Sequence, residues 1–146
     1  MTAETYPVKT KVLAYITRQQ GGKRQLLIFS HRDFPEAGLQ VPGGSVQSRE
    51  GLQEAVLREV EEESGLTNFS KLTFLGERFF VAHDKREIHQ RHFFHLRHNQ
   101  QSPDRFLHHV SAGEEDQGLA FQYEWFDLGK VPALAVEQDA MLTLLR

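Results

Sequence analysis

Residues 44–66, GSVQSREGLQEAVLREVEEESGL, constrain the fold most, because they predict an amphipathic helix whose last turns are crowded with carboxylates. Ser48 suits the N-cap of this helix, and Gly65 suits the left-handed residue that ends it, with Leu66 packing behind. The apolar residues recur at helical spacing and predict one buried face: Leu52, Ala55, Val56 and Val60. Such a helix needs a sheet or a second helix to cover that face.

Four glutamates, Glu59, Glu61, Glu62 and Glu63, fill the last turns of the predicted helix. Anions at a helix C-terminus oppose the macrodipole, and like charges one turn apart repel by roughly 0.2–0.5 kcal/mol per pair. Glu59 and Glu63 share a face, with Glu62 beside them, and carboxylate oxygens are the ligands that Mg²⁺ prefers. The cluster therefore predicts a site for a divalent cation, which can neutralise phosphate charge and acidify a bound water.

The segment also resembles the Nudix box, Gx5Ex7REUxEExGU with U aliphatic. Every fixed position matches: Gly44, Glu50, Arg58-Glu59-Val60, Glu62-Glu63 and Gly65-Leu66. The competing interpretation is a charged, solvated helix with a coincidental pattern. The resemblance implies that Glu50 and Arg58, paired about two turns apart, orient the helix; a loop carbonyl is the alternative partner of Arg58. It also implies that the Gly43 carbonyl is a metal ligand, in a Pro-Gly-Gly turn that approaches ligands closely.

Bulk properties fit one compact domain over residues 1–146. Hydrophobic residues make up 39% of the chain, charged residues 25%, and the net charge is −3. These values indicate neither a nucleic-acid footprint nor a membrane surface, and no apolar run approaches the length of a membrane span. The chain has no cysteine, so disulfides and thiol catalysis are excluded. A cytoplasmic location is expected, and a homodimer is possible.

The order of predicted elements resembles that of Nudix domains, an α/β/α sandwich with a mixed sheet. A continuous apolar run at 26–29 indicates a strand buried on both faces. The polar segment 99–118 is predicted to be one long loop near the site, and 134–146 a helix with Val136, Ala140, Met141, Leu144 and Leu145 on one face. The remaining predicted strands span residues 8–17, 71–81, 88–97 and 120–128.

Loop and strand residues supply further candidates around the predicted site. Arg32 follows a buried strand and either contacts substrate phosphate or is an exposed charge. Glu115, or its neighbour Glu114, either adds a late carboxylate or is solvated. His108 and His109 reach the site or have no role. Phe79 and Phe80 belong to the core or stack a base. Four histidines spaced by three alternate faces of a strand, so they are expected to be solvated or paired rather than to bind zinc: His89, His92, His95 and His98.

The resemblance implies a Mg²⁺- or Mn²⁺-dependent hydrolase that cleaves the pyrophosphate linkage of a nucleoside diphosphate joined to another group, X. Glu59 and Glu63 are the expected ligands, Glu62 is a ligand or the base, and Glu115 has an auxiliary role. The alternative is a nucleotide-binding Nudix domain that senses without turnover. Residues Val81-Ala82-His83 carry neither the proline typical of ADP-ribose hydrolases nor the tyrosine typical of dinucleoside polyphosphate hydrolases. The sequence therefore leaves X undefined.

Overall fold

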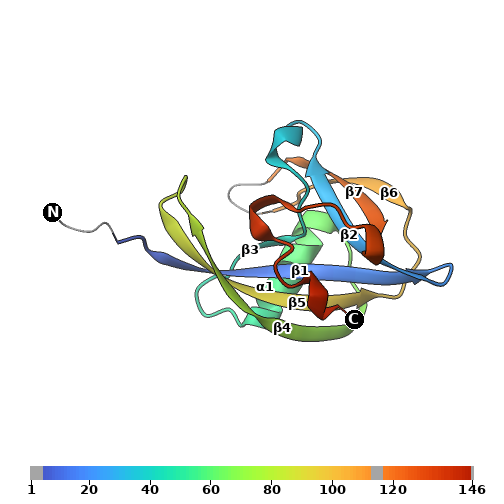
Figure 1. The fold of residues 1–146 in the computed structure, drawn as a ribbon, viewed down its shortest axis with the longest axis horizontal. Helices are drawn as coiled ribbons and strands as arrows, with labels where there is room; N and C mark the ends of the chain where they lie inside the picture. The colour runs from blue at the N-terminus through green and yellow to red at the C-terminus, as the bar shows by residue number, and fades with distance from the viewer. Residues whose placement is uncertain (1–4, 113–116, 146) are drawn as a thin grey trace.

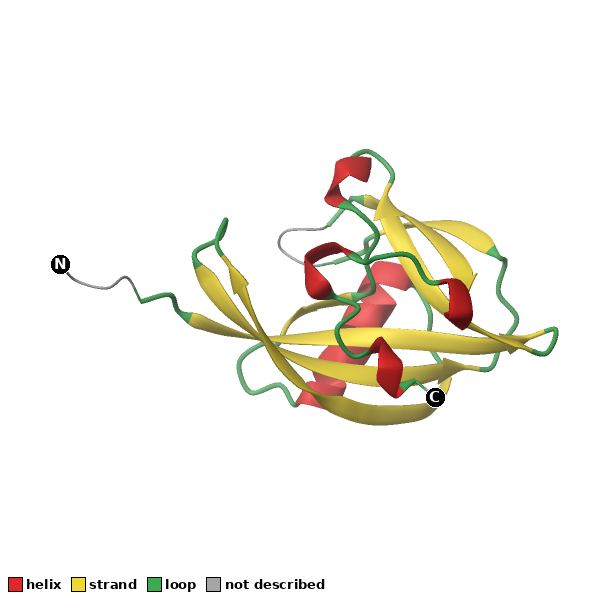
Figure 2. Ribbon diagram, viewed as in Figure 1, coloured by secondary structure: helices red, strands yellow, loops and turns green. Residues whose placement is uncertain are grey.

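The computed structural model describes residues 5–112 and 117–145, and their strands form one mixed sheet with a helix on one face (Figures 1 and 2). The strand order is β4-β5-β1-β2-β7-β6, with β3 paired to β1. The elements are β1 (Val8–Gln20), β2 (Lys23–His31), β3 (Gly43–Ser45), α1 (Leu52–Ser64), β4 (Phe69–Ala82), β5 (Glu87–His98), β6 (Arg105–His109) and β7 (Ala120–Asp127). Short 3-10 helices are η1 (Pro35–Ala37), η2 (Leu128–Lys130), η3 (Ala135–Glu137) and η4 (Leu142–Leu144). The α/β class and the mixed sheet are confirmed.

Strand β1 is central, because it pairs with three others. It runs parallel to β5 from the pair Val8 and Ile88 to the pair Thr17 and Arg97. Its pairings with β2 and β3 are antiparallel. The β3 pairing brings Gly44 opposite Val12, so the glycine loop that precedes α1 is fixed to the middle of the sheet.

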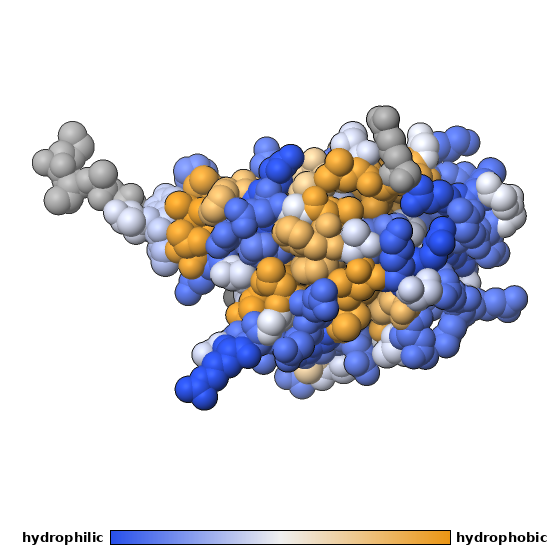
Figure 3. Space-filling view, turned by 90° about the horizontal axis from the view of Figure 1, so that it is seen from below, coloured by the Kyte–Doolittle hydropathy of each residue, from blue (hydrophilic) through white to orange (hydrophobic). Residues whose placement is uncertain are grey.

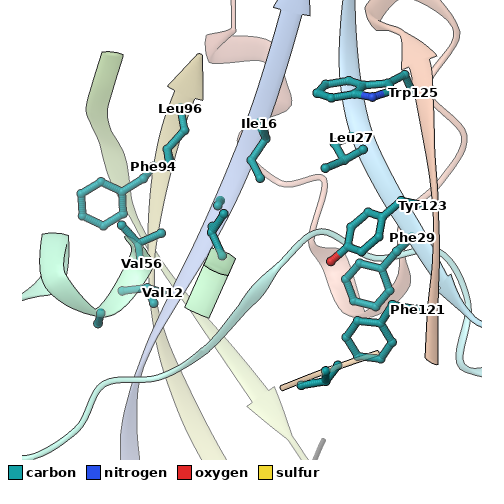
Figure 4. Close-up of a cluster of buried hydrophobic side chains, with 14 residues drawn as sticks. Val12, Ile16, Leu27, Phe29, Val56, Phe94, Leu96, Phe121, Tyr123 and Trp125 are labelled. Carbon is teal, nitrogen blue, oxygen red and sulfur yellow. The ribbon is translucent and has the colours of Figure 1, made fainter. Parts of the chain in front are cut away.

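The core lies on both faces of β1. Alternate β1 residues pack with α1 on one face, where Val12, Val56 and the β2 and β7 side chains form one cluster (Figure 4). The opposite β1 residues, Leu13 and Tyr15, pack with the C-terminal segment. Full burial of such side chains stabilises the fold by about 1.5–3 kcal/mol each. The prediction that residues 26–29 are buried on both faces is confirmed.

The prediction of a helix over residues 134–146 is wrong. The segment instead forms η3 and η4, which cover the sheet face opposite α1. Val136 and Glu137 adopt left-handed φ angles of 46° and 60°, which interrupt any continuous helix. Val136 and Leu144 are consequently about half exposed, although both were placed on the buried face.

The prediction of one long loop over residues 99–118 is also wrong. This segment contains the strand β6, which pairs antiparallel with β7. Strand β6 is polar because it lies at the sheet edge, where alternate residues face water. Glu114 and Glu115 lie outside the described residues. One predicted end of α1 is confirmed, because Gly65 is the left-handed C-cap. The predicted N-cap Ser48 is wrong, because Gly51 holds that position.

The four β5 histidines are buried rather than solvated, with 4–9% of each residue exposed. His95 Nε2 and Thr17 Oγ1 are 2.6 Å apart, and His89 Nε2 lies 2.9 Å from Glu87. His98 stacks on Trp125. The described residues contain no group of three or more His, Asp or Glu side chains already arranged to hold a metal ion. The histidines therefore belong to the core and its polar pairs.

Strand β4 forms one edge of the sheet and carries exposed apolar side chains, among them Phe74, Phe79 and Val81. Figure 3, seen from below Figure 1, shows hydrophobic groups interleaved with hydrophilic ones on that side. The interpretation of Phe79 as a core residue is wrong, since 59% of it is exposed. Across the described ranges, no helix has the length and apolar character to cross a membrane.

Candidate active site

Arg58 is the organising side chain of the box. Its Nε and Nη2 donate to the two carboxylate oxygens of Glu50 at 2.6 and 2.9 Å, and Nη2 also donates to the Ser45 carbonyl at 3.0 Å. Nη1 reaches Glu59 at 2.8 Å and Glu62 at 3.3 Å. The predicted pairing of Arg58 with Glu50 is confirmed, as is its contact with a loop carbonyl.

The electrostatics of the pair follow from this geometry. Hydrogen bonding from Arg58 lowers the pKa of the Glu50 carboxyl below its ordinary value, outweighing the effect of burial. The same bond raises the pKa of the Arg58 guanidinium. Both side chains are mostly buried, with 23% of Arg58 and 11% of Glu50 exposed. The pair therefore joins α1 to the loop before it.

Glu59 packs against a glycine that cannot be replaced without moving it. A Cβ atom on Gly44 would lie 2.3–2.5 Å from the three carboxylate atoms of Glu59. A Cβ on Gly43 would lie 2.4 Å from the Val12 carbonyl oxygen. Both glycines are thus required by close approach, one to a carboxylate and one to β1.

Glu63 lies on the same side of α1, one turn after Glu59. Its Oε1 accepts a hydrogen bond from the Gly43 N–H at 2.9 Å, and only 5% of the residue is exposed. Glu59 and Glu63 therefore both meet the glycine loop, from which their carboxylates converge on Gly43 and Gly44. This is the arrangement expected of residues that share a cation.

The end of α1 is held by Tyr123, which sequence analysis did not assign to the site, and by His108, one of its two histidine candidates. Tyr123 on β7 donates its hydroxyl to the Glu63 carbonyl at 2.9 Å. Burial, assisted by the charge of Glu63, raises the pKa of the Tyr123 phenol well above its ordinary value. His108 Nε2 lies 3.0 Å from the Glu62 carbonyl oxygen and its ring contacts Gly65. His108 thus supports the helix end. The other candidate, His109, makes no such contact with α1 in the described residues.

A cavity of about 350 Å³ opens beside the glycine loop. Gly43, Gly44 and Glu63 form one wall, and Phe29 and Phe121, stacked with ring centroids 4.1 Å apart, form another. Charged and polar side chains also line it: Lys11, His31, Gln40, Asp84, Lys85, His89, Arg91 and Gln138. A larger cavity of about 580 Å³ lies near the C-terminus, between Lys23 and Leu145, and includes none of the box residues.

Two other predicted residues lie in different places. Arg32 is half exposed, forms an ion pair with its neighbour Asp33 at 3.2 Å, and does not line the cavity. Phe80 does line it, and the Arg91 guanidinium lies over its ring at 4.1 Å. The cavity residues Lys11, His89 and Arg91 were missed, because their convergence depends on the pairing of β1 with β5 rather than on sequence spacing.

The donor set is chemically suited to a divalent cation, because Glu59, Glu62 and Glu63 offer oxygen donors only, as Mg²⁺ or Mn²⁺ prefers. Among the described residues these carboxylates are not grouped around a common metal position. In this conformation Glu59 and Glu62 are bonded to Arg58, so a cation would compete with the guanidinium for their oxygens.

The chain belongs to the NUDIX domain family, whose model matches residues 8–145. No curated protein matches the sequence. The fold is similar to those of solved Nudix structures. A MutT Nudix hydrolase from Burkholderia pseudomallei has a TM-score of 0.70 and 23% identity, covering 95% of this chain and 98% of that one.

Two further structures widen the comparison. The NUDIX domain of NrtR from Shewanella oneidensis, complexed with ADP-ribose, has a TM-score of 0.70 and 16% identity, covering 99% of this chain and 88% of that one. A C. elegans Ap4A hydrolase has a TM-score of 0.68 and 21% identity, with 94% of both chains covered. These identities establish a shared fold, and the bound ligands belong to the neighbours.

Proposed function

We propose that this protein is a Nudix hydrolase that cleaves the pyrophosphate linkage of a nucleoside diphosphate joined to a group X, with Mg²⁺ or Mn²⁺ as cofactor. The observation that carries the proposal is the convergence of Glu59 and Glu63 on the glycine loop at the wall of a cavity. A divalent cation in such a site supplies charge neutralisation at phosphate and acidifies a water.

The side chains of the chain perform the remaining tasks. Arg58 and Glu50 hold α1 against the loop, so that the carboxylates keep a fixed position relative to the cavity. Glu59 and Glu63, together with the Gly43 carbonyl, would hold the cation. Glu62 is a further ligand or the base that orients water, and Glu115 is the proposed auxiliary carboxylate. The stacked Phe29 and Phe121 offer an apolar wall for the nucleoside.

The experiment is phosphate release across a nucleotide panel in Mg²⁺, with Glu63→Gln as the test variant. Losing a metal ligand removes several kcal/mol of transition-state stabilisation, so kcat is expected to fall at least about 100-fold. Glu61→Gln is the matched control, because Glu61 is exposed on the same turn and occupies an unspecified box position. Equal activity of the two variants would refute the assignment.

A second candidate is a nucleotide sensor without turnover, favoured by the similarity to the NUDIX domain of NrtR, which was crystallised with ADP-ribose. Another NrtR structure contains a 27mer DNA. The complete set of box carboxylates supports the hydrolase instead. If the protein binds ADP-ribose stoichiometrically and releases no hydrolysis product in Mg²⁺, the sensor function is supported over the hydrolase.

A further inference from the structure

Arg91 is a buried cation that the proposed chemistry does not use. It lies on β5 with 6% of its surface exposed, and its Nη1 donates to the Val136 carbonyl at 2.6 Å. Its guanidinium covers the Phe80 ring at 4.1 Å. Within the described ranges, no carboxylate forms an ion pair with it. Arginine has five N–H donors and remains charged when buried. Arg91 lines both the cavity beside the glycine loop and a neighbouring cavity that Glu137 and Asp139 also line.

A second cation lies directly beside Arg91. The parallel pairing of β1 with β5 places Lys11 opposite Arg91, and both line the cavity beside the glycine loop. Like charges on directly paired residues destabilise a sheet. For His89, two residues before Arg91, burial lowers the pKa of the imidazole most, the hydrogen bond with Glu87 raises it, and the charges of Lys11 and Arg91 lower it further. The β1–β5 wall is therefore positive.

The backbone around Arg91 is held in an uncommon conformation. Val136, whose carbonyl accepts the Arg91 hydrogen bond, and Glu137 both have left-handed φ angles, although neither is glycine. The C-terminal segment that contains them crosses in front of β1 and β5 in Figure 1. Backbone strain of this kind persists where the surroundings require it. Here it fixes the guanidinium at the cavity wall.

The cavity thus has walls of opposite charge, the Glu63 carboxylate at the box and Lys11 with Arg91 on the sheet. We propose that Arg91 is a specificity-determining residue that binds a phosphate beyond the cleaved linkage. The inference rests on the proposed hydrolase function. It identifies the preferred substrates as nucleotides with three or more linked phosphates, rather than nucleoside diphosphates whose X is an uncharged sugar. Arginine suits this role because its planar fork matches phosphate oxygens.

The first test compares kcat/KM for adenosine triphosphate and ADP-glucose in Mg²⁺. Wild type is expected to prefer the triphosphate. Arg91→Gln should lower kcat/KM for the triphosphate about 10- to 100-fold, mainly through KM, because charge-assisted hydrogen bonds of this kind are lost. The value for ADP-glucose should change less than about 3-fold, since its X carries no phosphate to lose. A preference for ADP-glucose, or an equal fall for both substrates, would overturn the proposal.

Arg78→Gln is the matched control. Arg78 lies opposite Arg91 on β4, is exposed, and does not line the cavity beside the glycine loop. Its loss removes the same charge and should leave the substrate preference unchanged. If Arg78→Gln changes the preference as much as Arg91→Gln, general surface charge rather than Arg91 determines it.

A second test needs no turnover, so it separates this inference from the proposed function. Inorganic tripolyphosphate is titrated into metal-free protein, and its Kd is measured by calorimetry. Binding should weaken about 10-fold or more in Arg91→Gln but not in Arg78→Gln. Unchanged affinity would refute the inference even if hydrolysis is found. Arg91→Lys keeps the positive charge and loses the planar guanidinium, so its Kd for tripolyphosphate should lie between those of wild type and Arg91→Gln. If Arg91→Gln does not fold, Arg91→Lys takes its place in both tests.

Discussion

Removing Arg58 should destabilise the fold as well as the site. Arg58→Ala deletes the two hydrogen bonds to Glu50, the one to the Ser45 carbonyl and those to Glu59 and Glu62, so the Glu50 carboxylate loses its positively charged partner. Breaking a fully buried pair costs about 3–5 kcal/mol, and exposed pairs contribute about 0–1 kcal/mol. With 23% of Arg58 and 11% of Glu50 exposed, an intermediate loss of about 2–3 kcal/mol is expected.

The assay is thermal unfolding without metal, where this loss corresponds to a fall in Tm of roughly 5–10 °C. Arg105→Ala is the control, because Arg105 forms an ion pair with Glu124 at 3.1 Å on the exposed edge. That variant should lose less than about 1 kcal/mol. Equal melting temperatures of Arg58→Ala and wild type, with full hydrolysis, would refute the orienting role of Arg58.

The same pair gives a pH dependence with a defined sign. Folding lowers the pKa of Glu50 below its ordinary value of 4.5, so the stabilisation is fully present above that pH. It is lost as the pH falls through the lower pKa of the folded state. The difference in unfolding free energy between wild type and Arg58→Ala should therefore shrink in acid. A constant difference from pH 7 to pH 3 would contradict this coupling.

Three other perturbations give distinct outcomes. Gly44→Ala should lower turnover by about 10-fold or more with little loss of stability, because its Cβ displaces the flexible Glu59 carboxylate; Gly129→Ala, where nothing lies within 4 Å, is the control for activity and melting. Millimolar Mg²⁺ should raise the Tm of wild type, since a ligand at a hundredfold excess over Kd stabilises the folded state by about 2.7 kcal/mol. EDTA should abolish hydrolysis, and hydrolysis that persists in excess chelator would contradict the proposed metal dependence. Burial chiefly lowers the pKa of His95 to about 4, so stability should fall as pH drops from about 6.5 to 4, and His95→Gln should flatten that part of the profile measured by denaturant unfolding.

The sequence predicted the parts of the site that are local in the chain. Glu50 and Arg58 are only eight residues apart, and the resemblance to the Nudix box indicated their pairing, with a loop carbonyl as the alternative partner of Arg58; the structure shows both contacts. The apolar periodicity of α1 and the left-handed Gly65 are likewise short-range properties. Glu59 and Glu63 needed only the helical repeat to be placed on one side.

The parts that were missed depend on contacts between distant segments. Arg91 reaches the cavity because β5 pairs with β1, and nothing in the neighbouring sequence specifies that register. The C-terminal helix was predicted from apolar spacing, but Val136 takes a left-handed conformation with its carbonyl bonded to Arg91. The sequence of strand β6 is polar and was predicted to be a loop. It is an edge strand, and its extended conformation depends on pairing with β7.

The parallel pairing of β1 with β5 also has a consequence for biosynthesis. Val8 pairs with Ile88, about 80 residues later in the chain. Ribosomes add about 5–20 residues per second, so the apolar β1 strand waits roughly 4–16 s for its main partner to be made. The part of β1 between Val12 and Ile16 is buried in the folded protein. The β1–β5 pairing therefore joins segments far apart in the chain, whereas the β1–β2 hairpin joins neighbouring ones, so β1 acquires its two partners at different stages of synthesis.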